Sequence, residues 1–322
     1  MQYKASVIIV SYNNYKDTTG PCIESICSDT PNKNIEIIVV DNNSTDETPE
    51  KLREFAKKNS NLKPLLNTDN RGFAGGNNDG VAMATGEILI LLNSDTIIPT
   101  GMLNRIVELM LENSDWGMLG PVTNEAGNEQ KIPVQSGNVD EIIDQGLEWC
   151  RHADNDYFIT DRLDFCCVAL RTVDYRRLGG LDEGFGRGYY EDDDFCIRAR
   201  LAGLKMVMAE EVFICHLSGK SFSKFGNAYV KKLMRANKAK LKKKHGRNCR
   251  FYHVRKQYIK LLRQYAERKK HLSDVVQLQN LDYRFRRRML FAQSLYPNNP
   301  LKKLIYALQL GAIDKKYNIG AP

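Results

Sequence analysis

The chain has 322 residues, of which 42% are hydrophobic and 27% charged, so it can bury a core and is long enough for two domains. No apolar run approaches the roughly 20 residues of a membrane span, and we expect no signal peptide, because the first residues lead directly into a strand-like run. The eight cysteines show no CxxC spacing, a pattern typical of reduced thiols in a cytoplasmic protein and not of a disulfide framework or a zinc site.

The net charge of +8 conceals two parts of opposite sign. Residues 1–219 hold 20 basic and 35 acidic residues, a net charge of −15, whereas residues 220–322 hold 27 basic and 4 acidic residues, a net charge of +23. The acidic body argues against nucleic acid lying across it. The basic C-terminal third leaves open an anionic partner such as membrane lipid, RNA or the acidic body itself.

Strand and helix patterns alternate through the first third of the chain. Continuous β-branched apolar runs such as Val7–Val10 are typical of strands buried on both faces of a parallel sheet. We expect strands over residues 6–10, 35–40, 62–66 and 87–92, and helices over residues 17–27, 48–59 and 78–84. This alternation predicts an α/β fold with a mostly parallel sheet flanked by helices.

Polar residues gather where these strands end, the edge at which open α/β sheets bind ligands. Asp41 follows the second strand, a glycine-rich loop over residues 70–78 follows the third, and Asp95 follows the fourth. Each could simply form an Asx turn or a helix cap. Several on one edge favour a nucleotide pocket, although neither the dinucleotide fingerprint nor a P-loop is present.

Four consecutive carboxylates, Glu191 to Asp194, lie between two tyrosines and an apolar run. Adjacent negative charges repel one another, and burying any of them carries a large desolvation cost. Such a run is either a solvated loop or a place where a cation or a reacting proton needs it. The aromatic and apolar flanks favour a partly buried wall.

Seven short motifs together resemble the inverting family-2 glycosyltransferases of the GT-A fold, in particular their bacterial rhamnosyltransferase-like branch. They occur in the family's order across roughly residues 5–225. The motifs are Val7-Ile-Ile-Val-Ser-Tyr-Asn13, Ile38-Val-Val-Asp-Asn-Asn-Ser-Thr-Asp46, Asn70-Arg-Gly-Phe-Ala-Gly-Gly-Asn77, Ile90-Leu-Leu-Asn-Ser-Asp95, Gly179-Gly-Leu-Asp-Glu183, Tyr190-Glu-Asp-Asp-Asp-Phe195 and Cys215-His-Leu-Ser-Gly-Lys-Ser221.

The resemblance implies a domain organisation and a donor site. Residues 1–222 would form the GT-A domain, with a nucleotide-sugar half over 1–114 and an acceptor half over 115–222, and residues 223–322 a basic helical extension. Asp41 would pair with the edge of a uracil or thymine, unless it only caps a turn. The other donor contacts implied are Ser11, Tyr12, Arg71, Gly72, Gly75, Asn77, Asn93 and Ser94.

The resemblance also implies a metal site for Mn2+ or Mg2+, which take oxygen ligands and bridge phosphates. Asp95 would be a ligand from the family's DxD-type motif, in which Asn93 departs from the strict pattern and could contact ribose or a metal-bound water. His216 would be a second ligand. A histidine after an apolar strand is more often structural, but the following Ser218–Ser221 favours the ligand.

Asp192 matches the family's general base, which takes the proton from the acceptor hydroxyl in a single inverting displacement. A helix beginning near Asp192 would place Asp193 and Asp194 in its first turn, where the helix dipole favours acidic residues. Aromatic faces suit sugar rings, although core packing is an equal explanation for each aromatic residue. The candidate acceptor contacts are Glu191, Trp116, Trp149, Tyr189 and Tyr190.

Four amphipathic helical patterns follow in the basic third, over residues 225–241, 251–265, 284–295 and 301–310. Their apolar stripes favour helix–helix packing, while the lysine excess suits an anionic membrane surface on the inner face of the cell membrane.

The function predicted from sequence is metal-dependent inverting transfer of a sugar from a UDP- or dTDP-linked donor to an acceptor hydroxyl, in bacterial surface glycan or lipid-linked oligosaccharide assembly. A protein acceptor such as a flagellin or an adhesin is an alternative. A non-catalytic nucleotide-sugar or anionic-polymer binding protein is an alternative of another class. A phosphoryl-transfer enzyme would need a denser ligand set at the end of the first strand, and nucleic acid is not the expected partner.

Overall fold

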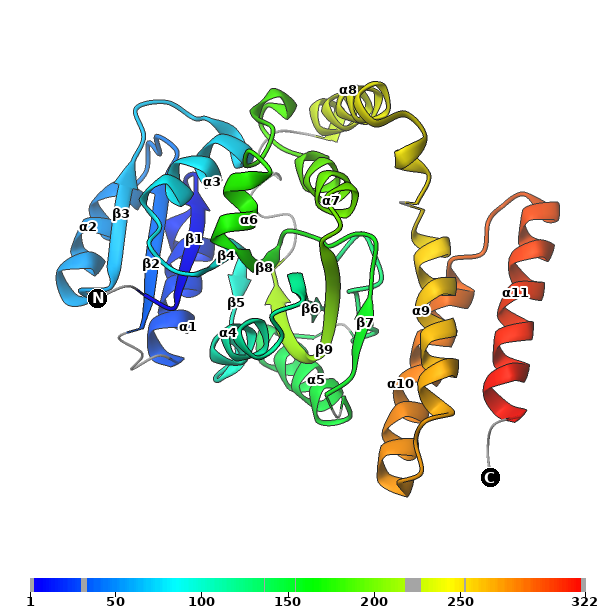
Figure 1. Cartoon of the computed structure of the whole chain (residues 1–322). Helices are drawn as coiled ribbons and strands as arrows, with labels where there is room; N and C mark the ends of the chain where they lie inside the picture. Colours follow the sequence, from blue (N-terminus) through cyan, green and yellow to red (C-terminus); the bar gives the residue numbers. More distant parts are fainter. Residues whose placement is uncertain are drawn as a thin grey trace.

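The computed structural model describes residues 3–29, 34–135, 137–153, 155–217, 227–251 and 253–319. Within these ranges nine strands form one sheet in the order β3-β2-β1-β4-β8-β6-β9-β5, with β7 paired to β9. Figure 1 shows this sheet in the middle of the molecule, with the C-terminal helices beside it. Ser218–Ser221, which supported the metal site, lies outside the described residues.

The first four strands form a parallel part of the sheet. Its strands are β1 (Ala5–Ser11), β2 (Ile35–Asp41), β3 (Leu62–Leu66) and β4 (Ile88–Asn93). Ser11 pairs with Asp41 in register, and Val10 pairs with Asn93. The carboxyl ends of β1, β2 and β4 therefore meet at one edge, as predicted.

Antiparallel pairing begins beyond β4. The remaining strands are β5 (Thr96–Ile97), β6 (Trp116–Thr123), β7 (Tyr157–Ile159), β8 (Cys167–Arg171) and β9 (Lys205–His216). β8 pairs antiparallel with both β4 and β6, and β5 pairs antiparallel with β9. The β5–β9 pair sets Thr96 opposite His216 and so brings two distant candidate metal ligands, Asp95 and His216, to one place.

Helices cover both faces of the sheet. They are α1 (Gly20–Asp29), which follows a π-helical turn over Tyr15–Thr19, α2 (Thr48–Lys58), α3 (Gly72–Met83), α4 (Met102–Glu112), α5 (Val139–Arg151), α6 (Thr172–Arg177) and α7 (Glu191–Leu201). α3 begins six residues before the expected helix at 78, inside the predicted glycine loop. Glycine allows this helix to approach the sheet, since a Cβ at Gly80 would lie 2.4 Å from the Cγ2 atom of Ile8.

The basic third forms α8 (Asn227–His245), α9 (Val254–Lys269), α10 (Val275–Ser294) and α11 (Pro300–Ile319). α10 begins earlier than the apolar pattern predicts, because the side chain of Asp274 caps it by accepting a hydrogen bond from the Gln277 amide at 2.9 Å. In the part of the chain that the structure describes, no helix is long and apolar enough to span a bilayer.

The helices α9, α10 and α11 share one hydrophobic core with the sheet. Phe158, Met208 and Phe213 of the sheet pack in the same cluster as Tyr265 and Phe285. Phe158 stacks on Tyr265 with ring centroids 4.5 Å apart. The expected helix–helix packing is thus present, but it is also packing against the body.

Two arginines of α10 reach into this core. Arg284 and Arg288 are both fully buried, and both pair with Glu210 of β9, at 2.6 and 2.7 Å. Arg284 also pairs with Asp156, and Arg288 donates to the carbonyl oxygens of Glu129 and Lys131, each at 2.6 Å. Removing one partner of such a buried pair leaves the other charge without compensation.

We therefore expect Arg288→Met to lower the free energy of unfolding by about 3–5 kcal/mol, measured by urea denaturation. Arg286→Met removes an exposed arginine of the same helix and should change it by less than about 0.5 kcal/mol. Equal losses in the two variants would contradict a specific role for the buried charge.

Candidate active site

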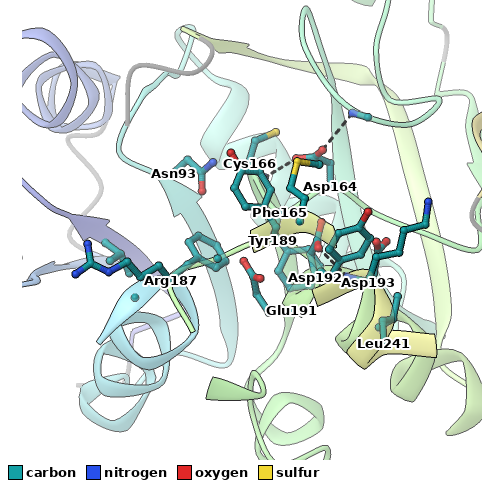
Figure 2. Close-up of a pocket in the computed structure, with 18 of the residues that line it drawn as sticks. Asn93, Asp164, Phe165, Cys166, Arg187, Tyr189, Glu191, Asp192, Asp193 and Leu241 are labelled. Atoms are coloured by element: carbon teal, nitrogen blue, oxygen red, sulfur yellow. Dashed lines mark hydrogen bonds between the residues drawn. The ribbon is translucent and has the colours of Figure 1, made fainter. Parts of the chain in front are cut away.

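A pocket of about 840 Å³ opens where the carboxyl ends of β1 and β4 face the first turn of α7. One face of α8 forms its far wall. Figure 2 shows Glu191, Asp192 and Asp193 along one side of this pocket, with Asn93 and Asp164 facing them. Among the residues predicted from sequence, the pocket is lined by Tyr12, Gly72, Asn93, Ser94, Asp95, Tyr189, Tyr190, Glu191, Asp192 and His216.

The other predicted residues do not line the pocket: Ser11, Asp41, Arg71, Gly75, Asn77 and Trp116. Ser11 is buried, and its hydroxyl bonds with that of Thr19 at 2.7 Å. Arg71 instead pairs with Asp79 and with Glu183, the latter at 2.7 Å. The expected loop over the base is helical from Gly72, and these two ion pairs hold the guanidinium of Arg71.

Two tryptophans proposed as acceptor contacts are core residues, which corrects that expectation. Trp116 begins β6, is 3% exposed and packs edge-on against Tyr157. Trp149 is 1% exposed, and the guanidinium of Arg288 lies 4.9 Å from its ring centre. Neither ring lines the pocket. Core packing, the alternative left open by the sequence, accounts for both.

Asp41 ends β2 and is followed by Asn42, which lines the pocket. Its Oδ2 atom accepts a hydrogen bond from the Ser44 amide at 3.0 Å, and its Oδ1 atom is buried with no hydrogen-bond partner. Burial raises the pKa of this carboxyl. An unpaired buried oxygen is costly in isolation, and its neighbours Tyr12 and Asn42 line the pocket. Asp41 therefore does cap the turn, but it uses only one of its two carboxylate oxygens for this.

Asp95 and His216 form a pair with 3.3 Å between Oδ1 and Nε2. His216 Nδ1 lies 3.2 Å from the Glu125 carbonyl oxygen, which accepts a hydrogen bond from it. Burial lowers the pKa of His216, but the bond to Asp95 and its charge outweigh burial and raise it to about 9. Metal-binding histidines are oriented in this way, with one ring nitrogen donating to a carbonyl. The donor set fits a divalent cation in place of that proton.

Within the described residues, no group of three or more His, Cys, Asp or Glu side chains is arranged to hold a metal ion. At the pocket, the candidate metal ligands among the described residues are the pair Asp95 and His216.

The acid run forms the first turn of α7, as predicted. Glu191, Asp193 and Asp194 are buried, whereas the Asp192 side chain is 18% exposed and lines the pocket. Asp192 Oδ1 accepts a hydrogen bond from the Asp193 amide at 2.8 Å. Of the four acids, Asp192 is thus both accessible and fixed in orientation.

Asp194 has a purely structural environment. It pairs with Arg198 at 2.8 Å, with Lys244 at 2.7 Å and with His245 at 2.6 Å. Burial acts to raise the pKa of Asp194, but the bonds from Lys244 and His245 with the charge of Arg198 lower it overall. The helix-dipole explanation for this residue is therefore incomplete, because α8 supplies most of its compensation.

Arg162 compensates the remaining acids. It comes from the segment between β7 and β8, and its Nε atom lies 2.6 Å from Asp193 Oδ1 and Nη2 lies 3.9 Å from Asp192 Oδ2. Burial raises the pKa of Asp192, Arg162 opposes this, and the charge of Asp164 adds to it. Burial and the charge of Asp192 raise the pKa of Glu191 to about 8, which favours its protonated form.

Sequence reasoning missed Arg162 and Asp164, both of which line the pocket. They occur singly, in Asp161-Arg-Leu-Asp164, and no local spacing shows that they face α7. The sequence holds one signal for this loop. Charged residues give way to apolar residues just before β8, and such a change marks the end of a loop at the sheet edge.

The loop before α7 is held in an unusual conformation. Tyr189 and Tyr190 have φ angles of 70° and 78°, a region that bulky side chains rarely adopt. The buried side chain of Asn237 of α8 donates hydrogen bonds to the carbonyl oxygens of Phe185, Gly188 and Tyr189, at 2.8, 2.9 and 3.0 Å. A backbone conformation of this kind costs about 1–3 kcal/mol per residue and persists only where surrounding contacts hold it in place. Here the contacts from α8 hold the loop.

A curled, mostly parallel sheet with a pocket at its edge is the arrangement of the GT-A fold. The family model of glycosyl transferase family 2 matches residues 6–171, and the chain belongs to that family. The similarity predicted from the motifs is confirmed at this level.

Curated relatives are similar over part of their length. An uncharacterized glycosyltransferase of Nostoc sp. is 31% identical over 46% of this chain and 48% of its own length. The poly(ribitol-phosphate) beta-glucosyltransferase of Bacillus spizizenii is 34% identical over 36% of this chain and 19% of its own. An Escherichia coli UDP-Glc:alpha-D-GlcNAc-diphosphoundecaprenol beta-1,3-glucosyltransferase is 34% identical over 37% of this chain and 45% of its own. The matches thus span about half or less of these proteins.

Solved structures share the fold. GalNAc-T7, solved with UDP, GalNAc and Mn2+, superposes with a TM-score of 0.60 and 16% identity over 93% of this chain and 59% of its own. The mannosyltransferase PcManGT of Pyrobaculum calidifontis, in complex with GDP-Man and Mn2+, gives 0.53 and 18% over 98% of this chain and 76% of its own.

The charges around Asp192 generate a prediction about pH. The general base that the family resemblance implies for Asp192 must be ionised, so kcat/KM for sugar transfer should fall as the pH drops through the raised pKa of Asp192. Arg162→Gln removes the charge that lowers this pKa and should move the acid limb up by about one pH unit.

The matched variant Asp164→Asn removes a charge that raises the same pKa, so its acid limb should move to lower pH. Both are read from pH profiles of kcat/KM, with thermal melts as a check on folding. Shifts of the same sign in the two variants would contradict this electrostatic explanation.

Proposed function

We propose that this protein is a metal-dependent inverting glycosyltransferase that transfers a sugar from a UDP- or dTDP-linked donor to an acceptor hydroxyl. The observation that carries the proposal is the position of Asp192, which is accessible and oriented at the pocket that also holds Asp95 and His216. The proposed domain, residues 1–222, places the donor at 1–114 and the acceptor mainly at 115–222.

The donor base would lie beside Tyr12 and Asn42, with the free Oδ1 atom of Asp41 accepting a hydrogen bond from the N–H of uracil or thymine. Asn93 and Ser94 line the route from there to Asp95. A pyrimidine N–H would satisfy the unpaired oxygen of Asp41. Gly72, whose φ is +70°, brings its backbone to the pocket wall.

Asp95 and His216 would hold Mn2+ or Mg2+. When bound, the ion offsets the charge that grows on the departing diphosphate. Both structural neighbours were solved with Mn2+, and a mixed oxygen and nitrogen donor pair suits that ion.

Asp192 would take the proton of the acceptor hydroxyl as its oxygen attacks the anomeric carbon from the face opposite the diphosphate. One carbon–oxygen bond forms while the bond to the diphosphate breaks, so the configuration inverts. Neutral Glu191 can donate a hydrogen bond to the acceptor, and Tyr189 and Tyr190 offer rings for a sugar to pack against.

Asp192→Asn should keep the donor site and lose about 10²–10⁴-fold in the rate of transfer. Donor binding is measured by thermal shift with a panel of UDP- and dTDP-sugars, with and without Mn2+, and transfer by release of the nucleotide diphosphate. Near wild-type transfer by the variant would exclude Asp192 as the base. A wild-type protein that is stabilised by donors but never turns them over would favour the non-catalytic binding protein.

The acceptor is proposed to be a glycan or a lipid-linked saccharide, since the E. coli relative is named for a diphosphoundecaprenol acceptor. A protein hydroxyl is the alternative.

We also propose peripheral attachment to the inner face of the cell membrane through α11. Its outward residues Leu301, Leu304, Ile305 and Leu308 are 49–67% exposed, and Lys302 and Lys303 flank them. Figure 1 shows α11 at the outer edge of the molecule.

Binding to phosphatidylglycerol vesicles should therefore fall as salt rises and be lost in Leu304→Gln/Leu308→Gln, measured by vesicle flotation. A C-terminal truncation is unsuitable here, because it would expose the core that Arg288 enters. The control, Val173→Gln/Leu201→Gln, changes two equally exposed apolar residues of the acidic body. Undiminished binding by the α11 variant would rule out this surface.

A further inference from the structure

One face of α8 lines the pocket beyond Asp192. Met234, Lys238, Leu241 and Lys242 all contribute to the wall, and their spacing of four, seven and eight residues places them on one side of a helix. Figure 2 shows Leu241 and Asn93 on opposite sides of Asp192. Since Asn93 belongs to the donor side, this face of α8 belongs to the acceptor side.

α8 is fixed in place by buried polar contacts. Asn237 binds three carbonyl oxygens of the loop before α7, and Lys244 and His245 bind the buried Asp194. The groups that α8 presents to the pocket are therefore positioned by the same contacts that position the first turn of α7.

Four lysines of α8 lie near the pocket or the loop before α7, and they differ in their surroundings. Lys240 lies 4.8 Å from the ring centre of Phe185, and Lys244 pairs with Asp182 and Asp194, each at 2.7 Å. Lys238 and Lys242, in contrast, are exposed at the pocket, and among the described residues no carboxylate lies within ion-pair distance of either. Two ammonium groups one helical turn apart at a pocket wall attract an anion with several oxygens.

Resting on the proposed function, we propose that the acceptor carries a phosphate group and that Lys238 and Lys242 bind this phosphate while the accepting hydroxyl faces Asp192. The two lysines would make the enzyme select phosphorylated acceptors over neutral sugars. The same chemistry could be met by the donor diphosphate, and the position of α8 across Asp192 from Asn93 favours the acceptor.

The test is titration calorimetry of the full chain with glucose 1-phosphate and with methyl glucoside, in saturating UDP and Mg2+ so that the donor site is filled. We expect glucose 1-phosphate to bind at least about tenfold more tightly, and this preference to vanish in Lys238→Gln/Lys242→Gln. The control Lys231→Gln/Lys243→Gln removes the same charge from exposed positions of α8 outside the pocket and should keep the preference. Lys238→Arg/Lys242→Arg should keep it as well.

Equal binding of the two ligands by the wild type, or a preference that survives in Lys238→Gln/Lys242→Gln, would overturn the proposal. A preference seen without UDP and abolished by UDP would also overturn it, because it would assign the lysines to the donor diphosphate. Calorimetry measures binding and needs no catalytic turnover. A failure of the phosphate proposal can therefore be told apart from a failure of the Asp192 test, which measures sugar transfer.

Discussion

The cost of burying four consecutive acids shapes the centre of this molecule. A buried carboxylate needs a cation or a proton, and each acid of the α7 turn meets that need differently. Asp194 is compensated by charges from α7 and α8, Asp193 by Arg162 from the segment before β8, and the pKa of Glu191 is raised by burial and by the charge of Asp192. Asp192, which is 18% exposed at the pocket, is the acid of this turn that is most accessible to a ligand.

The sheet and its polar edge were predictable because they rest on local signals. Apolar β-branched runs gave β1 to β4 nearly to the residue, and turn residues marked the ends where Asp41 and Asp95 lie. The start of α3 was wrong, since glycines that read as a loop instead allow close packing on β1. Trp116 was misplaced because an aromatic residue has the same local pattern in a core and in a sugar site.

The pairings across long sequence separations were beyond local reasoning. Asp95 and His216 were linked through the motifs, but nothing in the spacing joins Arg162 to Asp193 or Asn237 to the loop at Gly188. The basic third shows the same limit. Composition predicts an anionic partner, whereas the structure divides the charges among the core at Arg288, the compensation of Asp194 and the pocket wall.

The shared core of the sheet and the last three helices has a consequence for how this fold can be recombined. The family model ends at residue 171, yet one hydrophobic cluster of the described residues has members from Val122 to Tyr317, and Arg284 and Arg288 bind groups on both sides of that boundary. Exchange between relatives at residue 171 would separate Arg284 from Asp156, and Arg288 from the carbonyl oxygens of Glu129 and Lys131. A chimera that keeps residues 122–317 from one parent would preserve these contacts and the shared core.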